Sequence, residues 1–491
     1  MSKFSMRAQY SPQFTLWTED QCHMIHHATF EILEQTGVMV YEKEALHLLK
    51  GAGCLVKGNL VRFPPALVSW AIDSAPERIV LADTDGKRTV FLEDGVVSYG
   101  MSNDCPFFYD PNNQSIRPSI LSDVEKAAMV ADDLDNIDFV GSLVLASDVT
   151  VGLSDLYHFR ALRLHTKKPI LGSSLDVHVL NAMIQMGVIS SGSIEEFKRN
   201  PNFAVYCEPT SPLIHSQNSL ERLLICAEYG VPVTYAPAPL SGGTGPATLA
   251  GTFVLGNAEC LSGLVIHQLK RCGSPFIFSC LAGPLDMKTT IAPYGDPFVN
   301  IISAAVGAMG RFYKLPSYGM SGCTDACVTD LQAAIEGTFS IFASALGRTN
   351  LVHDNGYTGN GMIGNLEYLV MTDEIIDMTK HFMKGIQVNE ETVPLDLIDE
   401  VGPGGNYLLS NHTLKHFKKE TWYPKYMNRS HYKKWLEEGG KDMGLKVHER
   451  VLNILKNTDR NGIADREIEE LDRVIMDEEK RIKKTRTEIR G

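Results

Sequence analysis

The sequence contains 491 residues, of which 44% are hydrophobic and 21% are charged, and this composition is typical of a folded globular protein. The formal net charge of −13 disfavours non-specific binding to nucleic acid, because phosphate backbones are bound by basic surfaces. No run of about eighteen consecutive apolar residues predicts a transmembrane helix, and the first residues lack the apolar segment of a signal peptide. The ten cysteines are scattered through apolar segments, as in reduced cytosolic proteins, so we expect a cytoplasmic location.

The first part of the chain, residues 1–92, predicts a small α/β extension. Thr18 is a candidate N-cap for a helix that ends near Gly37. A second helix, a short strand and a third helix are predicted over residues 42–75. We expect this extension to pack on the main fold or to close one end of it.

Eight short β-branched or apolar runs follow, and small or polar residues and a helical pattern come after each one. They recur about every thirty to forty residues, which is roughly the spacing of βα units in an eight-stranded barrel. We therefore predict an α/β fold with a TIM (β/α)8 barrel over residues 93–385. A doubly wound open sheet is the main alternative, because strand counts from one sequence are error-prone. The runs span residues 97–101, 137–145, 169–173, 203–208, 231–236, 275–280, 317–321 and 350–353.

The ends of three of these runs carry candidate ligand-binding residues, because ligands bind at the carboxyl ends of barrel strands. An aromatic cluster accompanies the first run and forms either a hydrophobic lid or a surface for a ligand cation. Glu208 ends the fourth run, as either a ligand group or a carboxylate paired within the barrel mouth. The last run opens abruptly into a polar, glycine-rich loop that begins at His353. The remaining candidates are Tyr99, Phe108 and Tyr109 in the cluster, and Asn355 and Tyr357 in the loop.

A glycine-rich loop follows the fifth run and contains Gly242, Gly243 and Thr244. It lacks both the GK[ST] ending of a P-loop and the GxGxxG spacing of a dinucleotide site, so a phosphate site is poorly supported. Close approach of a flat or bulky partner explains the glycines better. Cys323 and Cys327 suggest zinc, but the spacing is loose and no second pair of ligands is evident, so we expect no metal.

The last part, residues 386–491, predicts a C-terminal helical extension and tail. Apolar residues recur at helical spacing among charges over residues 463–482. We expect this helix to dock on the body of the protein or on a second subunit.

Five segments carry a resemblance to a known family: residues 235–269, 311–319 (RFYKLPSYG), 324–337 (TDACVTDLQAAIEG), 352–374 and 401–420. In them the chain resembles the trimethylamine methyltransferase superfamily, within it the branch without pyrrolysine that includes glycine betaine:corrinoid protein methyltransferases. The resemblance implies a TIM barrel that delivers a methyl group from an amine to the Co(I) centre of a separate cobalamin-carrying protein. It also implies a homo-oligomer with no tightly bound cofactor of its own. The region that holds pyrrolysine in the trimethylamine enzymes has only standard residues here, and we place the missing residue at Cys327.

The absence of pyrrolysine favours a quaternary amine substrate. A tertiary amine is a poor methyl donor unless its nitrogen is first quaternised or protonated, whereas a quaternary ammonium departs as a neutral tertiary amine. Glycine betaine, giving dimethylglycine, is the leading candidate. Proline betaine, carnitine, γ-butyrobetaine and choline-like compounds stay open, as does a barrel that binds a betaine or a corrinoid protein without chemistry.

The resemblance also suggests roles for the candidate residues. An ammonium group is expected against aromatic faces, and a substrate carboxylate is expected at His353 first and at Asn355 second, although His353 has a purely structural alternative. Glu208 is a candidate counter-charge. The aromatic candidates are Tyr99, Phe108, Tyr109 and Tyr357, and the residues expected to face the corrin ring are Gly242, Gly243, Thr244, Gly359 and Gly361.

Overall fold

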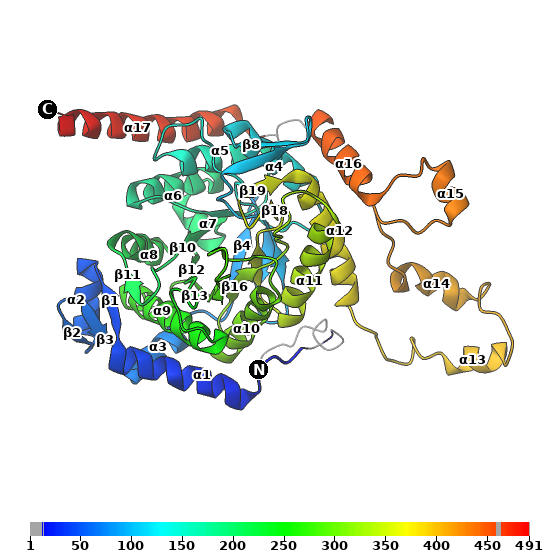
Figure 1. The fold of residues 1–491 in the computed structure, drawn as a ribbon, viewed down its shortest axis with the longest axis horizontal. Coiled ribbons are helices and arrows are strands. Elements are labelled where there is room, and N and C mark those ends of the chain that lie inside the picture. The colour runs from blue at the N-terminus through cyan, green and yellow to red at the C-terminus, as the bar shows by residue number, and fades with distance from the viewer. Residues whose placement is uncertain (1–11, 13, 458–462, 491) are drawn as a thin grey trace.

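A computed structural model of the chain describes residues 12, 14–457 and 463–490. Its centre is a curled sheet of seven parallel strands in the order β6-β17-β16-β14-β12-β10-β9, with helices packed around it (Figure 1). From β9 to β17 the strands follow the chain in order, and the first strand, β6, pairs with the last, β17. A doubly wound sheet would reverse its strand order in the middle, so that alternative is wrong. The strands are β6 (Ser98–Tyr99), β9 (Ile170–Gly172), β10 (Phe203–Cys207), β12 (Val233–Tyr235), β14 (Phe276–Ser279), β16 (Ser317–Met320) and β17 (Leu351–His353).

Seven of the eight predicted runs are confirmed as these strands, and the second run, residues 137–145, is not a regular strand. It makes isolated parallel bridges from Phe139 to Gly100, beside β6, and from Val140 to Ile170 in β9. Leu143 adopts a φ of 63°, which interrupts the extended backbone that a strand requires. A third isolated parallel bridge joins Val144 to Cys105, so the predicted strand is reduced to separate bridges, of which those at Phe139 and Val140 lie at the two edges of the sheet.

Eight helices follow or flank the strands of the sheet. One of them, α9, is long and apolar enough to cross a membrane, but 78% of its most apolar window is buried inside the protein. A helix that is apolar all round is expected in such a core position. The helices are α4 (Leu121–Asp133), α5 (Ser154–His165), α6 (Val177–Ser191), α8 (Gln217–Tyr229), α9 (Leu249–Lys270), α10 (Pro297–Tyr313), α11 (Leu331–Gly347) and α12 (Leu366–Phe382).

A hairpin from the N-terminal region covers the amino ends of the strands. Its strands β4 (Ile79–Ala82) and β5 (Arg88–Leu92) share a buried apolar cluster with side chains from the sheet, among them Leu171 and Ile277. The Ala82 N–H donates to the carbonyl of Pro201, just before β10 begins. One end of the sheet is thereby closed, and its carboxyl end is left for ligands.

The rest of the N-terminal region packs on α9 and joins a small sheet, β11-β1-β3-β2. Thr18 caps α1 as predicted, and Gln21 completes a capping box. Because β11 comes from the loop after β10, this sheet joins the N-terminal region to the central fold. Its elements are α1 (Glu19–Glu31), η2 (Ile32–Thr36), β1 (Val38–Val40), α2 (Lys43–Gly51), β2 (Leu55–Lys57), β3 (Leu60–Arg62), α3 (Pro65–Ser74) and β11 (Ile214–His215).

Shorter elements surround the carboxyl ends of the central strands. A four-stranded sheet in the order β18-β19-β7-β8 lies there, as does the pair β13 and β15. The bounds are β7 (Phe107–Asp110), β8 (Ser115–Pro118), β13 (Leu240–Ser241), β15 (Gly283–Pro284), β18 (Tyr357–Thr358) and β19 (Ile363–Asn365), with α7 (Ile194–Arg199) preceding β10.

The C-terminal part leaves the body as an arm, residues 383–442, and returns to it (Figure 1). The arm carries α13 (Leu395–Val401), α14 (Asn411–Glu420) and α15 (Tyr432–Glu437), and α16 (Met443–Asn457) packs back on α12 and α4. The last helix, α17 (Asp465–Arg490), lies along α5 and α6. Of the two sites predicted for this helix, the structure shows docking on the body.

Candidate active site

A cavity of about 380 Å³ lies at the carboxyl ends of the central strands. It is the size of a small-molecule site and is reached from the side opposite the β4–β5 hairpin. Strands, the loops that follow them, and the β13–β15 pair all contribute to its wall. The polar and aromatic residues of the wall are Ser102, Asn103, Asp104, Ser173, Tyr206, Glu208, Tyr294, His353, Asp354 and Tyr357.

His353 and Asp354 bring two unpartnered polar atoms to this wall. The Nδ1 atom of His353 forms a short hydrogen bond with Oδ1 of Asp354, and the imidazole stacks on Tyr318 with ring centroids 4.4 Å apart. Asp354 has a φ of 81°, an uncommon conformation for a residue other than glycine that turns the chain sharply after β17. Within the described residues, His353 Nε2 and Asp354 Oδ2 are buried without a hydrogen-bond partner. Such atoms on a cavity wall indicate contact with a ligand.

Asp104 and Tyr357 form a second polar pair on the wall. The Tyr357 hydroxyl donates to Oδ1 of Asp104 and accepts from the Asp104 backbone N–H at 2.8 Å. Burial raises the pKa of the Asp104 carboxyl above its ordinary value, and the nearby Asp354 raises it further, while the Tyr357 hydrogen bond opposes both. Tyr357 therefore both orients this carboxylate and favours its charged form.

A third carboxylate, Glu208, lies at the exposed rim of the cavity. The Tyr206 hydroxyl donates to Glu208 Oε2 at 2.7 Å, and the Tyr206 ring lies 6.0 Å from that of Tyr318. Tyr294 and Tyr357 add two more aromatic rings to the wall. The cavity thus combines aromatic faces with carboxylates, which is the chemistry that binds organic cations.

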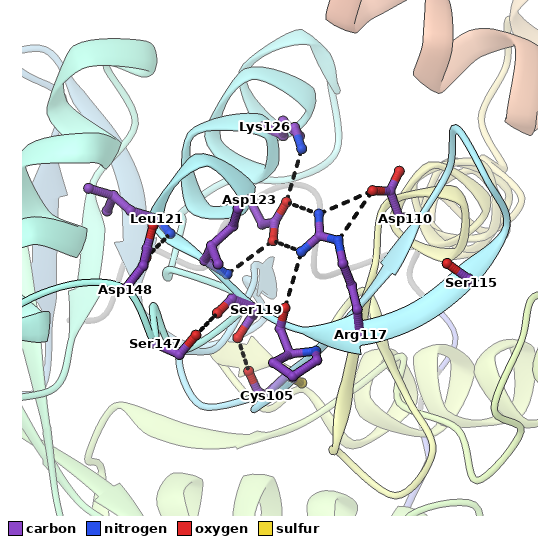
Figure 2. A network of polar contacts seen from close by, with 12 residues as sticks. Cys105, Asp110, Ser115, Arg117, Ser119, Leu121, Asp123, Lys126, Ser147 and Asp148 are labelled. Atoms are coloured by element: carbon purple, nitrogen blue, oxygen red, sulfur yellow. Dashed lines mark hydrogen bonds and ion pairs between the residues drawn. The ribbon is translucent and has the colours of Figure 1, made fainter.

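An ion-pair network supports the segment that carries Asp104. Figure 2 shows Arg117 between the carboxylates of Asp110 and Asp123. Its two terminal nitrogens lie 2.7 and 2.8 Å from the two oxygens of Asp123, a bidentate geometry, and Lys126 lies 3.0 Å from Asp123 Oδ1. Burial alone would raise the pKa of Asp123, but hydrogen bonds from Arg117 and Lys126 outweigh it and lower that pKa.

The same network fixes the backbone beside Asp104. Ser119, which follows β8, donates from its N–H and its hydroxyl to the carbonyl of Pro106, at 3.2 and 3.1 Å. The ring of Phe108 is covered by Arg117 at 5.3 Å and Lys126 at 5.6 Å from its centroid. The loop from Asp104 onward is therefore held by contacts on the side away from the cavity.

Three of the substrate-binding residues expected from the sequence, His353, Tyr357 and Glu208, lie together on the cavity wall. The other four do not. The ring of Tyr99 is buried beside Lys380, and Asn355 donates its side-chain N–H to the carbonyl of Gly100 at 3.0 Å. Phe108 is enclosed by Arg117 and Lys126, and Tyr109 lies in β7.

Of the residues expected to face a corrin ring, some lie next to the cavity wall and one is buried. Gly242 and Gly243 are exposed next to the wall residue Leu240, whose N–H donates to the hydroxyl of Thr244 at 2.9 Å. Gly361 faces the ring of the wall residue Tyr294, since an added Cβ would lie 3.3 Å from it. Gly359 is buried, where an added Cβ would lie 2.8 Å from Ile363.

Four residues of the wall were not predicted from the sequence: Asp104, Asp354, Tyr206 and Tyr294. Asp354 directly follows the last residue of β17, and Asp104 lies in the loop after β6, so their positions after strands were an available signal. Tyr294 comes from a long loop between β15 and α10 that has no periodic pattern, and only the folded chain brings it to the wall.

The two cysteines that suggested zinc differ in their surroundings. Cys323 is buried with Sγ 3.8 Å from the carbonyl of Tyr294, whereas Cys327 is exposed. Across the described ranges, no group of three or more His, Cys, Asp or Glu side chains is arranged to hold a metal ion.

Comparison with known proteins identifies the family. The family described as Trimethylamine methyltransferase (MTTB) matches residues 2–483. The chain is 33% identical to trimethylamine methyltransferase MttB of Methanosarcina barkeri, over 91% of each chain. It is 30% identical to a glycine betaine methyltransferase of Desulfitobacterium hafniense, over 91% of this chain and 94% of that one.

A solved structure supports the fold. The crystal structure of the Methanosarcina barkeri monomethylamine methyltransferase is similar with a TM-score of 0.53 at 12% identity, over 91% of this chain and 88% of that chain. At this identity the likeness concerns the fold alone. The family match over nearly the whole sequence and the 33% identity to a member show that the chain belongs to the trimethylamine methyltransferase (MTTB) family.

Proposed function

We propose that this protein transfers a methyl group from a quaternary amine to the Co(I) centre of a corrinoid carried by a separate protein. The observation that carries the proposal is the cavity itself, whose wall combines three carboxylates with the rings of Tyr206, Tyr294 and Tyr357. Aromatic faces attract a cation by about 0.5–2 kcal/mol each, depending on desolvation. Membership of the methyltransferase family gives the reaction class.

The proposed reaction requires little acid–base catalysis from the residues of this chain. A quaternary ammonium loses its methyl group and departs as a neutral tertiary amine, so no residue has to protonate the leaving nitrogen. The corrinoid, when bound, supplies the Co(I) nucleophile that accepts the methyl group. The residues of this chain hold the ammonium, aim one methyl group at the mouth and exclude water.

The rim of the cavity fits a flat macrocycle. Gly242 and Gly243 are exposed beside Leu240, and among the described residues a Cβ added at Gly242 would have only Met287 Sδ within 4 Å, at 3.6 Å. The glycines themselves add no side chain to this exposed loop, and we expect Gly242, Gly243 and Thr244 to face the corrin. Gly361 supports Tyr294 instead, and the buried Gly359 is a poorer candidate.

Three further expectations belong to this proposal. We expect residues 137–140, which bridge both edge strands, to complete a (β/α)8 barrel. We expect the protein to act in the cytoplasm, where the corrinoid partner is also expected. The division of the chain into an N-terminal extension, a barrel and a C-terminal extension, with boundaries at residues 92 and 385, stays a prediction.

We also expect a homo-oligomer that forms through the arm. No residue of α13, α14 or α15 is buried, and Ile386, Leu395 and Leu409 are 84%, 69% and 95% exposed. Helices of 7, 10 and 6 residues are too short to be stable alone in water. The backbone N–H groups of residues 425–427 tether the arm to Glu374, which leaves its apolar side chains available to another copy.

The proposal is tested by product analysis. The protein is mixed with chemically reduced cob(I)alamin and with each of a panel of quaternary amines carrying deuterated methyl groups. Mass spectrometry is expected to detect a demethylated tertiary amine and deuterated methylcobalamin in equal amounts. If no member of the panel yields either product, the proposed reaction is wrong.

A further inference from the structure

The cavity wall is acidic, and the described residues that form it include no cationic side chain to balance it. Among the described residues that line it, Asp104, Glu208 and Asp354 are carboxylates, His353 is the one imidazole, and neither lysine nor arginine is present. Glycine betaine, ranked first from the sequence, brings a carboxylate as well as an ammonium. A buried carboxylate requires a positive or hydrogen-donating partner, and other carboxylates nearby repel it.

His353 does not supply that positive charge. Its Nδ1 is bound to Asp354, so the pair carries one negative charge when the imidazole is neutral and no net charge when it is protonated. Glu208 and Asp104 add negative charge in either case. Lys288 is the lysine closest in sequence to a wall residue, since it lies on the loop between Pro284 and Ala292. It is exposed, and its backbone N–H donates to the Asp286 carboxylate.

The two unpartnered atoms of the His353–Asp354 pair favour a donor on the substrate. With the Nδ1–H of neutral His353 donated to Asp354, His353 Nε2 is a hydrogen-bond acceptor, and the unpartnered Asp354 Oδ2 is an acceptor too. A hydroxyl group can donate to either atom, whereas a carboxylate has only acceptors to offer. An ammonium and a hydroxyl therefore match both the charge and the hydrogen-bonding pattern of the wall.

We propose that the substrate is a quaternary ammonium alcohol of the choline type, with no carboxylate, whose ammonium is held by the acidic aromatic wall and whose hydroxyl donates to the His353–Asp354 pair. This proposal rests on the methyl-transfer function above and narrows its substrate. The named relatives include proteins for a substrate without a carboxylate, trimethylamine, and for one with a carboxylate, glycine betaine. The family alone therefore leaves the choice open.

The first test is binding, which requires no corrinoid. Isothermal titration calorimetry of the full chain with choline, tetramethylammonium and glycine betaine is expected to show choline binding at least about tenfold more tightly than glycine betaine. Tetramethylammonium is expected to bind more weakly than choline, because it lacks the hydroxyl. Equal or tighter binding of glycine betaine overturns the proposal, and equal binding of tetramethylammonium overturns the role of the hydroxyl.

A charge variant makes the test specific to the wall. Glu208→Gln keeps an acceptor for the Tyr206 hydroxyl and removes one negative charge, so it is expected to reduce the preference for choline over glycine betaine severalfold. Glu195→Gln is the matched control, since Glu195 is exposed on α7, which leads into the opposite end of β10. A preference that is the same in both variants contradicts the electrostatic argument.

A methyl-transfer assay then tests the proposed function and the proposed substrate class separately. Transfer to cob(I)alamin from glycine betaine at a higher kcat/KM than from choline leaves the proposed function intact and overturns the substrate class. Transfer from neither compound and from no other quaternary amine of the panel, together with the expected binding order, overturns the methyl-transfer function while the acidic site for an ammonium alcohol stands. No binding of any of the three compounds overturns the assignment of the cavity itself.

Discussion

Replacing Tyr357 with phenylalanine removes one hydroxyl that makes two hydrogen bonds inside the site. The hydroxyl donates to the Asp104 carboxylate and accepts from the Asp104 N–H. A hydrogen bond to a charged group contributes about 1.5–3 kcal/mol. The hydrogen bond from the Asp104 N–H is only part-buried, so the loss of its partner adds little to this. We therefore expect Tyr357→Phe to lower the free energy of unfolding by about 1.5–3 kcal/mol.

The same change acts on substrate binding through charge. The Tyr357 hydrogen bond opposes the rise that burial causes in the pKa of Asp104, so its loss raises that pKa further. Less of the carboxylate is then ionised near neutral pH. We expect KM for the quaternary amine to rise, and to rise more as the pH falls.

Urea denaturation and steady-state kinetics across a pH series check both effects. Tyr294→Phe is the control, since it removes the same group from the same wall and the Tyr294 hydroxyl makes no hydrogen bond with the described residues. A Tyr357→Phe protein with the stability and pH profile of Tyr294→Phe would refute the assigned role of the Asp104–Tyr357 pair.

Three other predictions follow from the charges and the exposed arm. Arg117→Met deprives the buried Asp123 of its bidentate partner, so the free energy of unfolding in urea should fall by about 3–5 kcal/mol, and no change would contradict the network. Burial lowers the pKa of His215 from 6.5 to about 3, so its contribution to stability is lost as the pH falls below 6.5. His215→Gln should therefore reduce the loss of stability between pH 7 and pH 5 by about 2 kcal/mol, and an equal loss in both proteins would exclude this cause. Leu409→Asp should dissociate the oligomer in light scattering while Leu55→Asp, exposed on β2, does not, and a native protein that is monomeric would contradict the role of the arm.

The strands were predictable because each is a short buried apolar run followed by polar residues, a local signal that the sequence carries directly. The second run has the same signal, but Leu143 turns with a positive φ, and tertiary contacts there override the pattern. Strand ends also predicted Glu208, His353 and Tyr357, because parallel strands bring their carboxyl ends to one face.

The predicted residues that do not line the cavity are held elsewhere by contacts that only the folded chain creates. The ring of Phe108 has the predicted preference for cations, but it meets Arg117 and Lys126 of its own chain instead of a ligand. Asn355 follows His353 by two residues, yet the sharp turn at Asp354 directs it to the backbone of Gly100. The alternation of apolar and polar residues along the chain does not predict a turn of that kind.

The central claim is methyl transfer from a quaternary amine to cobalt, and its most direct test is spectroscopic. The protein is mixed with cob(I)alamin, choline or glycine betaine is added, and the conversion to methylcobalamin is followed in the visible spectrum. We expect conversion that requires the protein, accompanied by one tertiary amine for each methylcobalamin formed. A cob(I)alamin spectrum that stays unchanged with both amines and with proline betaine and carnitine would contradict the account.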